Sequence, residues 1–240
     1  MPGSQYIALS GLRARVDELD RLAADIANIG TVGYKSTRGA RAAAERDPFG
    51  EALQTAIDTT SGGQRLDTTA GALAHTGRPL DLAIDGHGFF VVETPAGPRY
   101  TRDGSFSIGP ERQLVTRGGL PVQGTDGPIT IGEDGELRVD ADGSVWAGTT
   151  KAGQLSLVDF ADRGALVHEH GSLLRADGQT ATPIEAPVVE SGSLEQSNVS
   201  MADRIASLTT VSRGFEALQK ALSLMMNDVD GRAIEHLGRR

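Results

Sequence analysis

A few residues in the sequence have the types and spacings that ligand or metal chemistry would need. Gly86, His87 and Gly88 look like the start of a phosphate-binding loop, but neither a G-x-G-x-x-G pattern nor a Walker lysine follows, so a turn is the better interpretation. His168 and His170 alternate, which would place both on one face of a strand, as metal ligands sometimes are. Because no third ligand lies near them in the sequence, we expect no metal site there.

The remaining candidates for chemistry are weaker. Asp140, Asp142 and Gly143 suggest the start of a calcium-binding loop, but the acidic ligand expected at the twelfth position of such a loop is missing. No G-x-S-x-G elbow occurs, and the histidines have no serine or cysteine partner at a recognisable spacing. The sequence therefore predicts no catalytic residue, no cofactor and no metal, and it argues against an enzyme.

Composition narrows the possible partners. The 240-residue chain has a formal net charge of −9, whereas a nucleic-acid-binding domain normally presents a basic face, so no nucleic-acid partner is expected. Its hydrophobic content of 38% is low and 31 residues are glycine, which indicates a thin core with many tight turns. The absence of cysteine excludes disulfides and cysteine-ligated zinc.

The N-terminal segment lacks the features of a secretory signal. In MPGSQYIALSGLRARVDELD no basic stretch is followed by an apolar run, so a cleaved signal peptide is not expected. No window approaches the roughly 18 apolar residues of a membrane span, and no membrane insertion is predicted. If the protein leaves the cytoplasm, another route must carry it.

Apolar residues near both ends of the chain follow the three- and four-residue steps of a heptad seam. The N-terminal seam consists of Leu9, Leu12, Val16, Leu19, Ala23 and Ile26. The C-terminal seam, on a helix predicted over about 200–229, consists of Met201, Ile205, Leu208, Val211, Phe215, Leu218, Leu222, Met225 and Val229. Ser197 and Asn198 are the candidate N-cap residues of that helix. These stripes can pair with each other, with copies of the chain or with relatives, and the alternative is an ordinary helix pair in a monomer.

The middle of the chain has a period of two. From about residue 80 to residue 190, apolar residues alternate along short runs that are separated by frequent turn signals. Many of these signals are aspartate–glycine pairs: Asp85-Gly86, Asp103-Gly104, Asp126-Gly127, Asp134-Gly135, Asp142-Gly143 and Asp177-Gly178. Because such a pair between alternating apolar runs is a strong hairpin signal, we predict an antiparallel sandwich or barrel of short strands.

These patterns together predict an α+β fold. The terminal helices, in residues 1–35 and 198–240, would pair as a coiled-coil-like domain, and residues 80–197 would form a central, mainly antiparallel β domain. Residues 36–79 are rich in threonine, alanine, glycine and arginine, and they are expected to form an extended connector with one short helix around residues 49–57.

The stretch AADIANIGTVGYK, residues 23–35, ends the first helical pattern abruptly. The seam stops at Ile26, and the small and polar residues from Asn28 to Gly33 are predicted to form an exit turn. Gly33 is expected to take a left-handed backbone conformation that a β-carbon would disfavour. The stretch is therefore better interpreted as a joint in an assembly than as a ligand loop.

Three blocks of the sequence resemble the bacterial flagellar axial proteins, which are the rod and hook subunits. The first block, of the form AN-x-x-T-x-G-aromatic-Lys, is matched by Ala27, Asn28, Thr31, Gly33, Tyr34 and Lys35. The second, residues 81–124, contains GFF, YTR-x-G-x-F and a leucine–valine followed by a glycine pair. The third, residues 194–208, contains Ser197, Asn198 and Val199. The sequence departs from the family at Asp25 and Gly30, where asparagine is common.

The resemblance implies a structural rod subunit that assembles helically with copies of itself and with other rod proteins. The assembly would surround the export channel and transmit torque. It also implies passage through the flagellar export apparatus without a cleaved signal, and a place in the periplasmic span of the basal body. The seam residues given above, apart from Ala23, Met201 and Val229, are the predicted assembly contacts.

Two alternatives remain open within this interpretation. Chain length argues against the hook subunit, and the ending DVDGRAIEHLGRR favours the proximal-rod type over the distal-rod type of the same family. The alternative from a different class is a β domain that binds carbohydrate or cell wall and is carried on a coiled-coil oligomer.

Overall fold

The computed structural model describes residues 2–39, 64–132 and 135–237, and these fall into two compact units. The first, here called the helical unit, contains the N-terminal residues up to Ile26, Gly39, and the C-terminal residues from Ser200 onward. The second, the strand unit, contains residues 27–38 and 64–199. The predicted short helix at 49–57 lies outside the described residues, as does Asp134.

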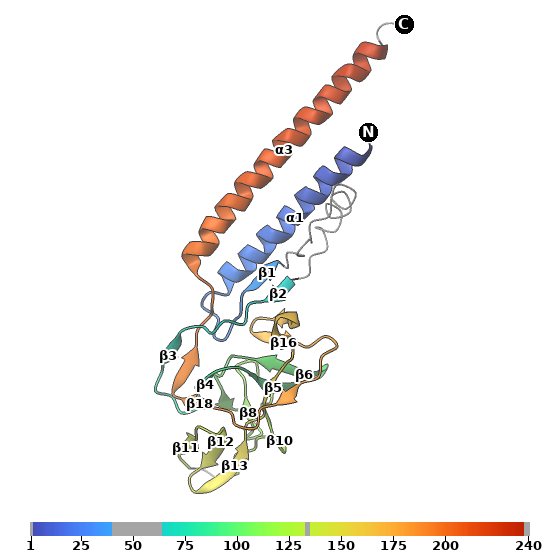
Figure 1. Ribbon diagram of the computed structural model, residues 1–240. Helices are drawn as coiled ribbons and strands as arrows, with labels where there is room; N and C mark the ends of the chain where they lie inside the picture. The colour runs from blue at the N-terminus through green and yellow to red at the C-terminus, as the bar shows by residue number, and fades with distance from the viewer. Residues whose placement is uncertain (1, 40–63, 133–134, 238–240) are drawn as a thin grey trace. The chain divides into compact units, whose positions relative to one another are not determined.

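Two long helices belong to the ends of the chain, as the heptad spacing predicts (Figure 1). Helix α1 spans Pro2–Ala27 and helix α3 spans Met201–Leu237. The 37 residues of α3 make a rod of about 55 Å at roughly 1.5 Å per residue, and the helix continues past the predicted end at Val229. Among the described residues, no helix combines the length and apolarity needed to cross a membrane.

The start of α3 corrects the predicted N-cap. Ser200, and neither Ser197 nor Asn198, occupies the capping position: its hydroxyl accepts from the Asp203 N–H at 3.5 Å and its carbonyl from the Arg204 N–H at 3.0 Å. The side chain of Asn198 is engaged in contacts within the strand unit instead. Local capping preference was therefore overridden by a tertiary role.

The exit turn after α1 forms as predicted. The Thr31 N–H donates to the Asn28 carbonyl at 3.0 Å, and the Thr31 hydroxyl contacts the Asn28 side-chain oxygen at 3.1 Å. Gly33 has a φ of +67°, which confirms the predicted left-handed conformation. The turn leads directly into the first short strand of the strand unit.

The strand unit consists of many short strands, and every described ladder from β3 to β19 is antiparallel, as predicted. The first strands are β1 Thr37–Gly39, β2 Gln64–Leu66, β3 Leu73–His75, β4 Leu82–Ile84, β5 Phe89–Thr94, β6 Gly97–Thr101, β7 Ser107–Ile108, β8 Leu114–Val115, β9 Gln123–Gly124 and β10 Gly127–Pro128. The later strands are β11 Leu137–Val139, β12 Ser144–Ala147, β13 Thr150–Gln154, β14 Leu157–Asp159, β15 Val167–His170, β16 Leu173–Arg175, β17 Thr182–Pro183, β18 Val189–Ser191 and β19 Ser193–Glu195. A short 3₁₀ helix, η1 at Arg163–Ala165, follows β14. The described chain thus has the predicted α+β class.

The largest sheet has the strand order β15-β16-β6-β5-β14-β17, and its central strand β5 is apolar on both faces. Phe90 and Val92 belong to one buried cluster, while Phe89 and Val91 belong to a second cluster on the opposite face. The few aromatic residues concentrate here: the Phe90 and Phe106 rings meet edge to face at 5.1 Å. Because successive side chains of a strand point to opposite faces, one strand connects both cores.

Only some of the aspartate–glycine pairs form hairpin turns. Asp126-Gly127 and Asp142-Gly143 do, between β9 and β10 and between β11 and β12. The hairpin prediction is wrong for Asp85-Gly86 and Asp103-Gly104, because β4 pairs with β18 and β6 pairs with β5 and β16. Gly104 has another role, since a β-carbon there would lie 1.7 Å from the Leu82 carbonyl oxygen.

Candidate assembly joint

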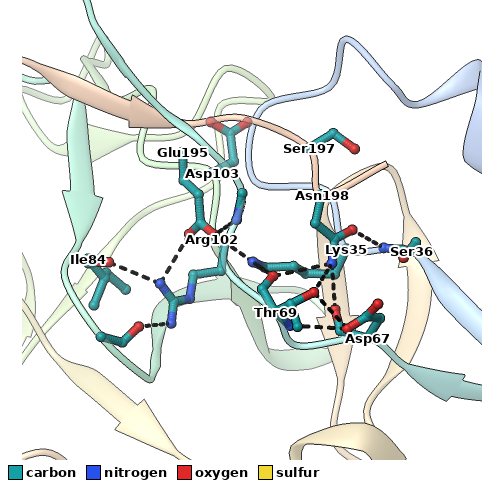
Figure 2. A network of polar contacts seen from close by, with 12 residues as sticks. Lys35, Ser36, Asp67, Thr69, Ile84, Arg102, Asp103, Glu195, Ser197 and Asn198 are labelled. Carbon is teal, nitrogen blue, oxygen red and sulfur yellow. Dashed lines mark hydrogen bonds and ion pairs between the residues drawn. The ribbon is translucent and has the colours of Figure 1, made fainter. Parts of the chain in front are cut away.

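The three sequence blocks that carried the family resemblance meet in one buried network of the strand unit (Figure 2). Lys35 comes from the first block, Arg102 from the second, and Glu195 and Asn198 from the third. These four residues are here called the joint. They fasten the segment that follows α1 to the segment that precedes α3, through the end of strand β6.

The carboxylate of Glu195 is the centre of the joint. Its Oε1 atom accepts hydrogen bonds from Lys35 Nζ at 2.5 Å and from the Gly71 N–H at 2.9 Å. Its Oε2 atom accepts from Arg102 Nη1 at 3.0 Å. With only 1% of its side chain exposed, this carboxylate exchanges water for three protein donors.

The two cations outnumber the carboxylate, and backbone carbonyls supply their remaining acceptors. Lys35 Nζ donates to the Thr69 carbonyl at 2.7 Å, and Arg102 donates to the carbonyls of Ile84 at 3.1 Å and Gly86 at 2.5 Å. Burial lowers the pKa of Lys35 and that of Arg102 below their ordinary values, although Glu195 opposes both shifts. The desolvated charges therefore depend on this fixed geometry.

The side chain of Asn198 connects Ser36, which directly precedes β1, to the β2–β3 loop. Its Oδ1 accepts from the Ser36 N–H at 2.7 Å, and its Nδ2 donates to the carbonyls of Asp67 at 2.8 Å and Thr69 at 3.2 Å. Its backbone N–H also donates to the Tyr34 carbonyl at 3.3 Å. One amide side chain thus binds three backbone groups, one just before β1 and two in the β2–β3 loop.

Gly33 and His168 complete the surroundings of Lys35. The Gly33 N–H donates to the Glu195 carbonyl at 2.7 Å, and a β-carbon at Gly33 would lie 2.3 Å from the Arg102 carbonyl carbon. His168 stacks on the Tyr34 ring at 4.8 Å, and its Nε2 lies 2.6 Å from the Lys35 carbonyl oxygen. Because a carbonyl can only accept, Nε2 carries the proton.

This arrangement explains the histidines that the alternation singled out. A register shift separates His168 from His170, so the two do not continue a regular strand face. His168 holds the backbone of the joint, and Glu169 pairs with Arg99. Within the described residues, no cluster of three or more potential ligands could hold a metal ion.

The joint is suited to fastening backbone segments and not to chemistry on a substrate. The side chains of Lys35 and Glu195 are 2% and 1% exposed, so no small molecule reaches them without opening the fold. Their charges are already matched by each other, by Arg102 and by carbonyl dipoles. The geometry therefore supports a structural role for these motif residues, in which buried charges favour one arrangement of three segments.

The predicted seam residues occupy varied environments on the two helices. Leu12, Leu19, Ile26, Leu208, Phe215 and Leu218 are half-buried, Val211 is buried, and Val16 and Ile205 are 40% and 49% exposed. The side chains of Leu9, Leu222 and Met225 lie outside the described part of the structure. Among the residues of α1 whose side chains are described, the buried ones are Leu22 and Asp25, both outside the predicted seam.

The motif residues differ in how deeply they are buried. Gly33, Tyr34, Lys35 and Val199 are buried, whereas Asn28, Thr31, Ser197 and Asn198 are half-buried and Ala27 is exposed. Sequence reasoning missed Arg102, Glu195 and Thr69 as functional residues. The available signal was that Arg102 and Glu195 stand inside the quoted blocks, and that a buried Lys35 would need an acidic partner.

The dependence of the free energy of unfolding on acidic pH can test the contacts of Asp67 in the β2–β3 loop. Burial alone would raise the pKa of Asp67, but hydrogen bonds from Thr69 and the charge of Arg38 outweigh it and hold the pKa below its ordinary value of 3.8. A lowered pKa in the folded state gives stability that is present above pH 3.8 and is lost as pH falls through the folded pKa. We expect the free energy of unfolding of the Asp67→Asn chain to fall less steeply than that of the unmodified chain as the pH decreases below about 4.

Urea unfolding at several pH values would measure this effect. The exposed turn residue Asp126 provides the control. In the Asp126→Asn chain, the free energy of unfolding should change with pH much as it does in the unmodified chain. If the free energy of unfolding of the Asp67→Asn chain falls with decreasing pH as steeply as that of the unmodified chain, the lowered pKa of Asp67 is contradicted.

Comparison with known proteins places these blocks in one family. The profile described as "Flagellar hook protein FlgE/F/G D1 domain" matches residues 83–147. The profile described as "Flagellar basal body rod FlgEFG protein C-terminal" matches residues 190–229. The first match includes Arg102, and the second includes Glu195 and Asn198.

Curated relatives extend the similarity to nearly the whole chain. The flagellar basal-body rod protein FlgF of Rhizobium meliloti is 35% identical over 97% of this chain and 97% of its own length. FlgF of Caulobacter vibrioides is 34% identical over 100% of this chain and 99% of its own length. The basal-body rod protein FlgG of Bacillus subtilis is 32% identical over 92% of this chain and 94% of its own length. The chain therefore belongs to the flagellar basal-body rod protein family, whose members are structural proteins and not enzymes.

Proposed function

We propose that this chain is a structural subunit of the flagellar basal-body rod, of the proximal-rod type. It would assemble helically with copies of itself and with other rod proteins around the export channel, and it would transmit torque. The observation that carries this proposal is the joint, in which blocks from both ends and the middle of the chain meet in one buried network. Similarity to FlgF over 97% of the chain supports the proximal type.

Exposed apolar side chains on the helices support an assembly role. Val16, Met201 and Ile205 are 40%, 50% and 49% exposed in the single chain, and an apolar seam gains most when a partner covers it. We therefore assign residues 1–35 and 198–240 to a coiled-coil-like assembly domain. Residues 80–197 would form the β domain, and residues 36–79 would connect the two.

Location and partners follow from the same proposal. The subunit would lie in the periplasmic span of the basal body and reach it through the flagellar export apparatus. The distal-rod type is the competing assignment, because FlgG of Bacillus subtilis is also similar over most of the chain. Electron microscopy of basal bodies labelled on this subunit would distinguish the two, since the label would lie at a different height along the rod.

Phe215→Asp is expected to block assembly while leaving the strand unit folded. Phe215 is half-buried on α3, and a carboxylate there would have to be desolvated in any packed helix interface. A strain that lacks the chromosomal gene and carries this variant should form basal bodies without a complete rod and should not spread in soft agar. Trp146, the only tryptophan, reports on the strand unit by its fluorescence.

The matched control is Gln219→Asp, one turn along the same helix on an exposed residue. This variant introduces the same charge and should support normal swimming. Swimming by the Phe215→Asp strain would show that the seam is wrongly assigned. If the strain that lacks the gene altogether still swims, the proposed rod function is wrong.

A further inference from the structure

Asp25 and Arg204 form an ion pair inside the helical unit. The Arg204 Nε atom lies 3.1 Å from Asp25 Oδ2, and the pair connects the last turn of α1 to the first turn of α3. Asp25 has no exposed surface, and the Arg204 side chain is 20% exposed.

Each charge lies at the end of its helix that disfavours it. The C-terminal end of a helix carries a partial negative charge, which repels Asp25, and no basic residue in the last turn of α1 compensates. The N-terminal end carries a partial positive charge, which repels Arg204 in the first turn of α3. Neither residue is explained by the stability of its own helix, but each is favourable when the two helix ends meet.

Burial makes the pairing selective. A carboxylate without exposed surface is strongly destabilising unless a cation or hydrogen-bond donors compensate it, so burying Asp25 against an apolar neighbour would be costly. A slip of one helical turn would move Arg204 by about 5.4 Å and separate the charges. Single polar residues in otherwise apolar helix interfaces are known to fix register in this way, at some cost in stability.

We propose that Asp25 and Arg204 form a register lock, which aligns α1 with α3 of its own chain in one position and disfavours other alignments. The apolar seams set the strength of helix packing, and the lock sets its alignment. Arg21, one turn earlier on α1, pairs with Glu18 at 3.7 Å. The proposal concerns the isolated chain and goes beyond the rod function.

A charge reversal tests the lock directly. In purified protein, hydrogen exchange of residues 19–26 and 204–211 should be at least about tenfold faster in Asp25→Arg and in Arg204→Asp than in the unmodified chain. The chain with both changes should recover to within about threefold of the unmodified chain. Asp20→Arg, an equal charge change at an exposed residue of α1, is the control and should have little effect.

Several outcomes would overturn the proposal. These are a double variant no better protected than the single variants, single variants that match Asp20→Arg, and an unmodified chain without protection at these residues. Recovery of protection on mixing Asp25→Arg chains with Arg204→Asp chains would show pairing between chains, which contradicts the own-chain alignment. If the reversals prevent folding, Asp25→Asn and Arg204→Gln can be compared in the same way as a milder pair of substitutions. Hydrogen exchange in the double variant should then be no faster than in whichever single variant exchanges faster.

Discussion

Replacing Glu195 with glutamine is expected to lower the free energy of unfolding of the strand unit by about 3–5 kcal/mol. The carboxylate accepts from Lys35 and Gly71 on one oxygen and from Arg102 on the other. A carboxamide has a single acceptor oxygen, so in either orientation its NH₂ group faces a buried cation or a donor. The result is two desolvated cations without an anion between them.

Urea unfolding followed by Trp146 fluorescence would measure the loss, because Trp146 lies on β12 within the strand unit. The control is Glu169→Gln, since Glu169 also pairs with an arginine, Arg99, but its side chain is 36% exposed. That variant should cost clearly less than Glu195→Gln, because the Glu169 carboxylate remains in contact with water. Equal losses for the two substitutions would refute the central role of the Glu195 carboxylate.

Gly33→Ala is expected to destabilise the strand unit by about 2–4 kcal/mol. A left-handed φ of +67° already disfavours a β-carbon, and that carbon would lie 2.3 Å from the Arg102 carbonyl carbon and from the Asp103 nitrogen. These are backbone atoms, so the chain next to Arg102 must move. The movement would also strain the 2.7 Å hydrogen bond from Gly33 to the Glu195 carbonyl.

Gly30→Ala provides the matched control for this substitution. Gly30 lies in the same exit turn, its φ is not positive, and a β-carbon there would meet no atom within 4 Å. The free energy of unfolding should change by less than about 0.5 kcal/mol. A Gly33→Ala chain as stable as the Gly30→Ala chain would show that the close backbone approach is not needed.

Features that depend on neighbouring residues could be predicted from the sequence. The heptad spacing predicted helices at both ends, the cluster of small and polar residues after Ile26 predicted the exit turn, and Gly33 was expected to be left-handed. Each of these rests on steric and periodic effects within a few residues. The antiparallel strands followed in the same way from alternation.

The joint could not be assembled from the sequence because its contacts are distant. Lys35 and Glu195 are separated by 160 positions, and Arg102 and Glu195 by 93. Local rules also failed where a tertiary contact competed for the same residue: Asn198 has a good capping side chain, yet it binds Ser36 and the β2–β3 loop. Similarly, Asp103-Gly104 carries a hairpin signal, but Gly104 serves the close approach to Leu82.

The sequence distance across the joint also has a consequence for the order of folding. Lys35 is synthesised long before Glu195, and any chain that passes a narrow channel from its N-terminus presents them in the same order. Until Glu195 arrives, Lys35 has no buried carboxylate and remains hydrated, so the segment after α1 stays open. Closure of such a long loop is slow and comes late. The joint can therefore form only after almost the whole chain has been delivered, and the strand unit becomes rigid no earlier than that.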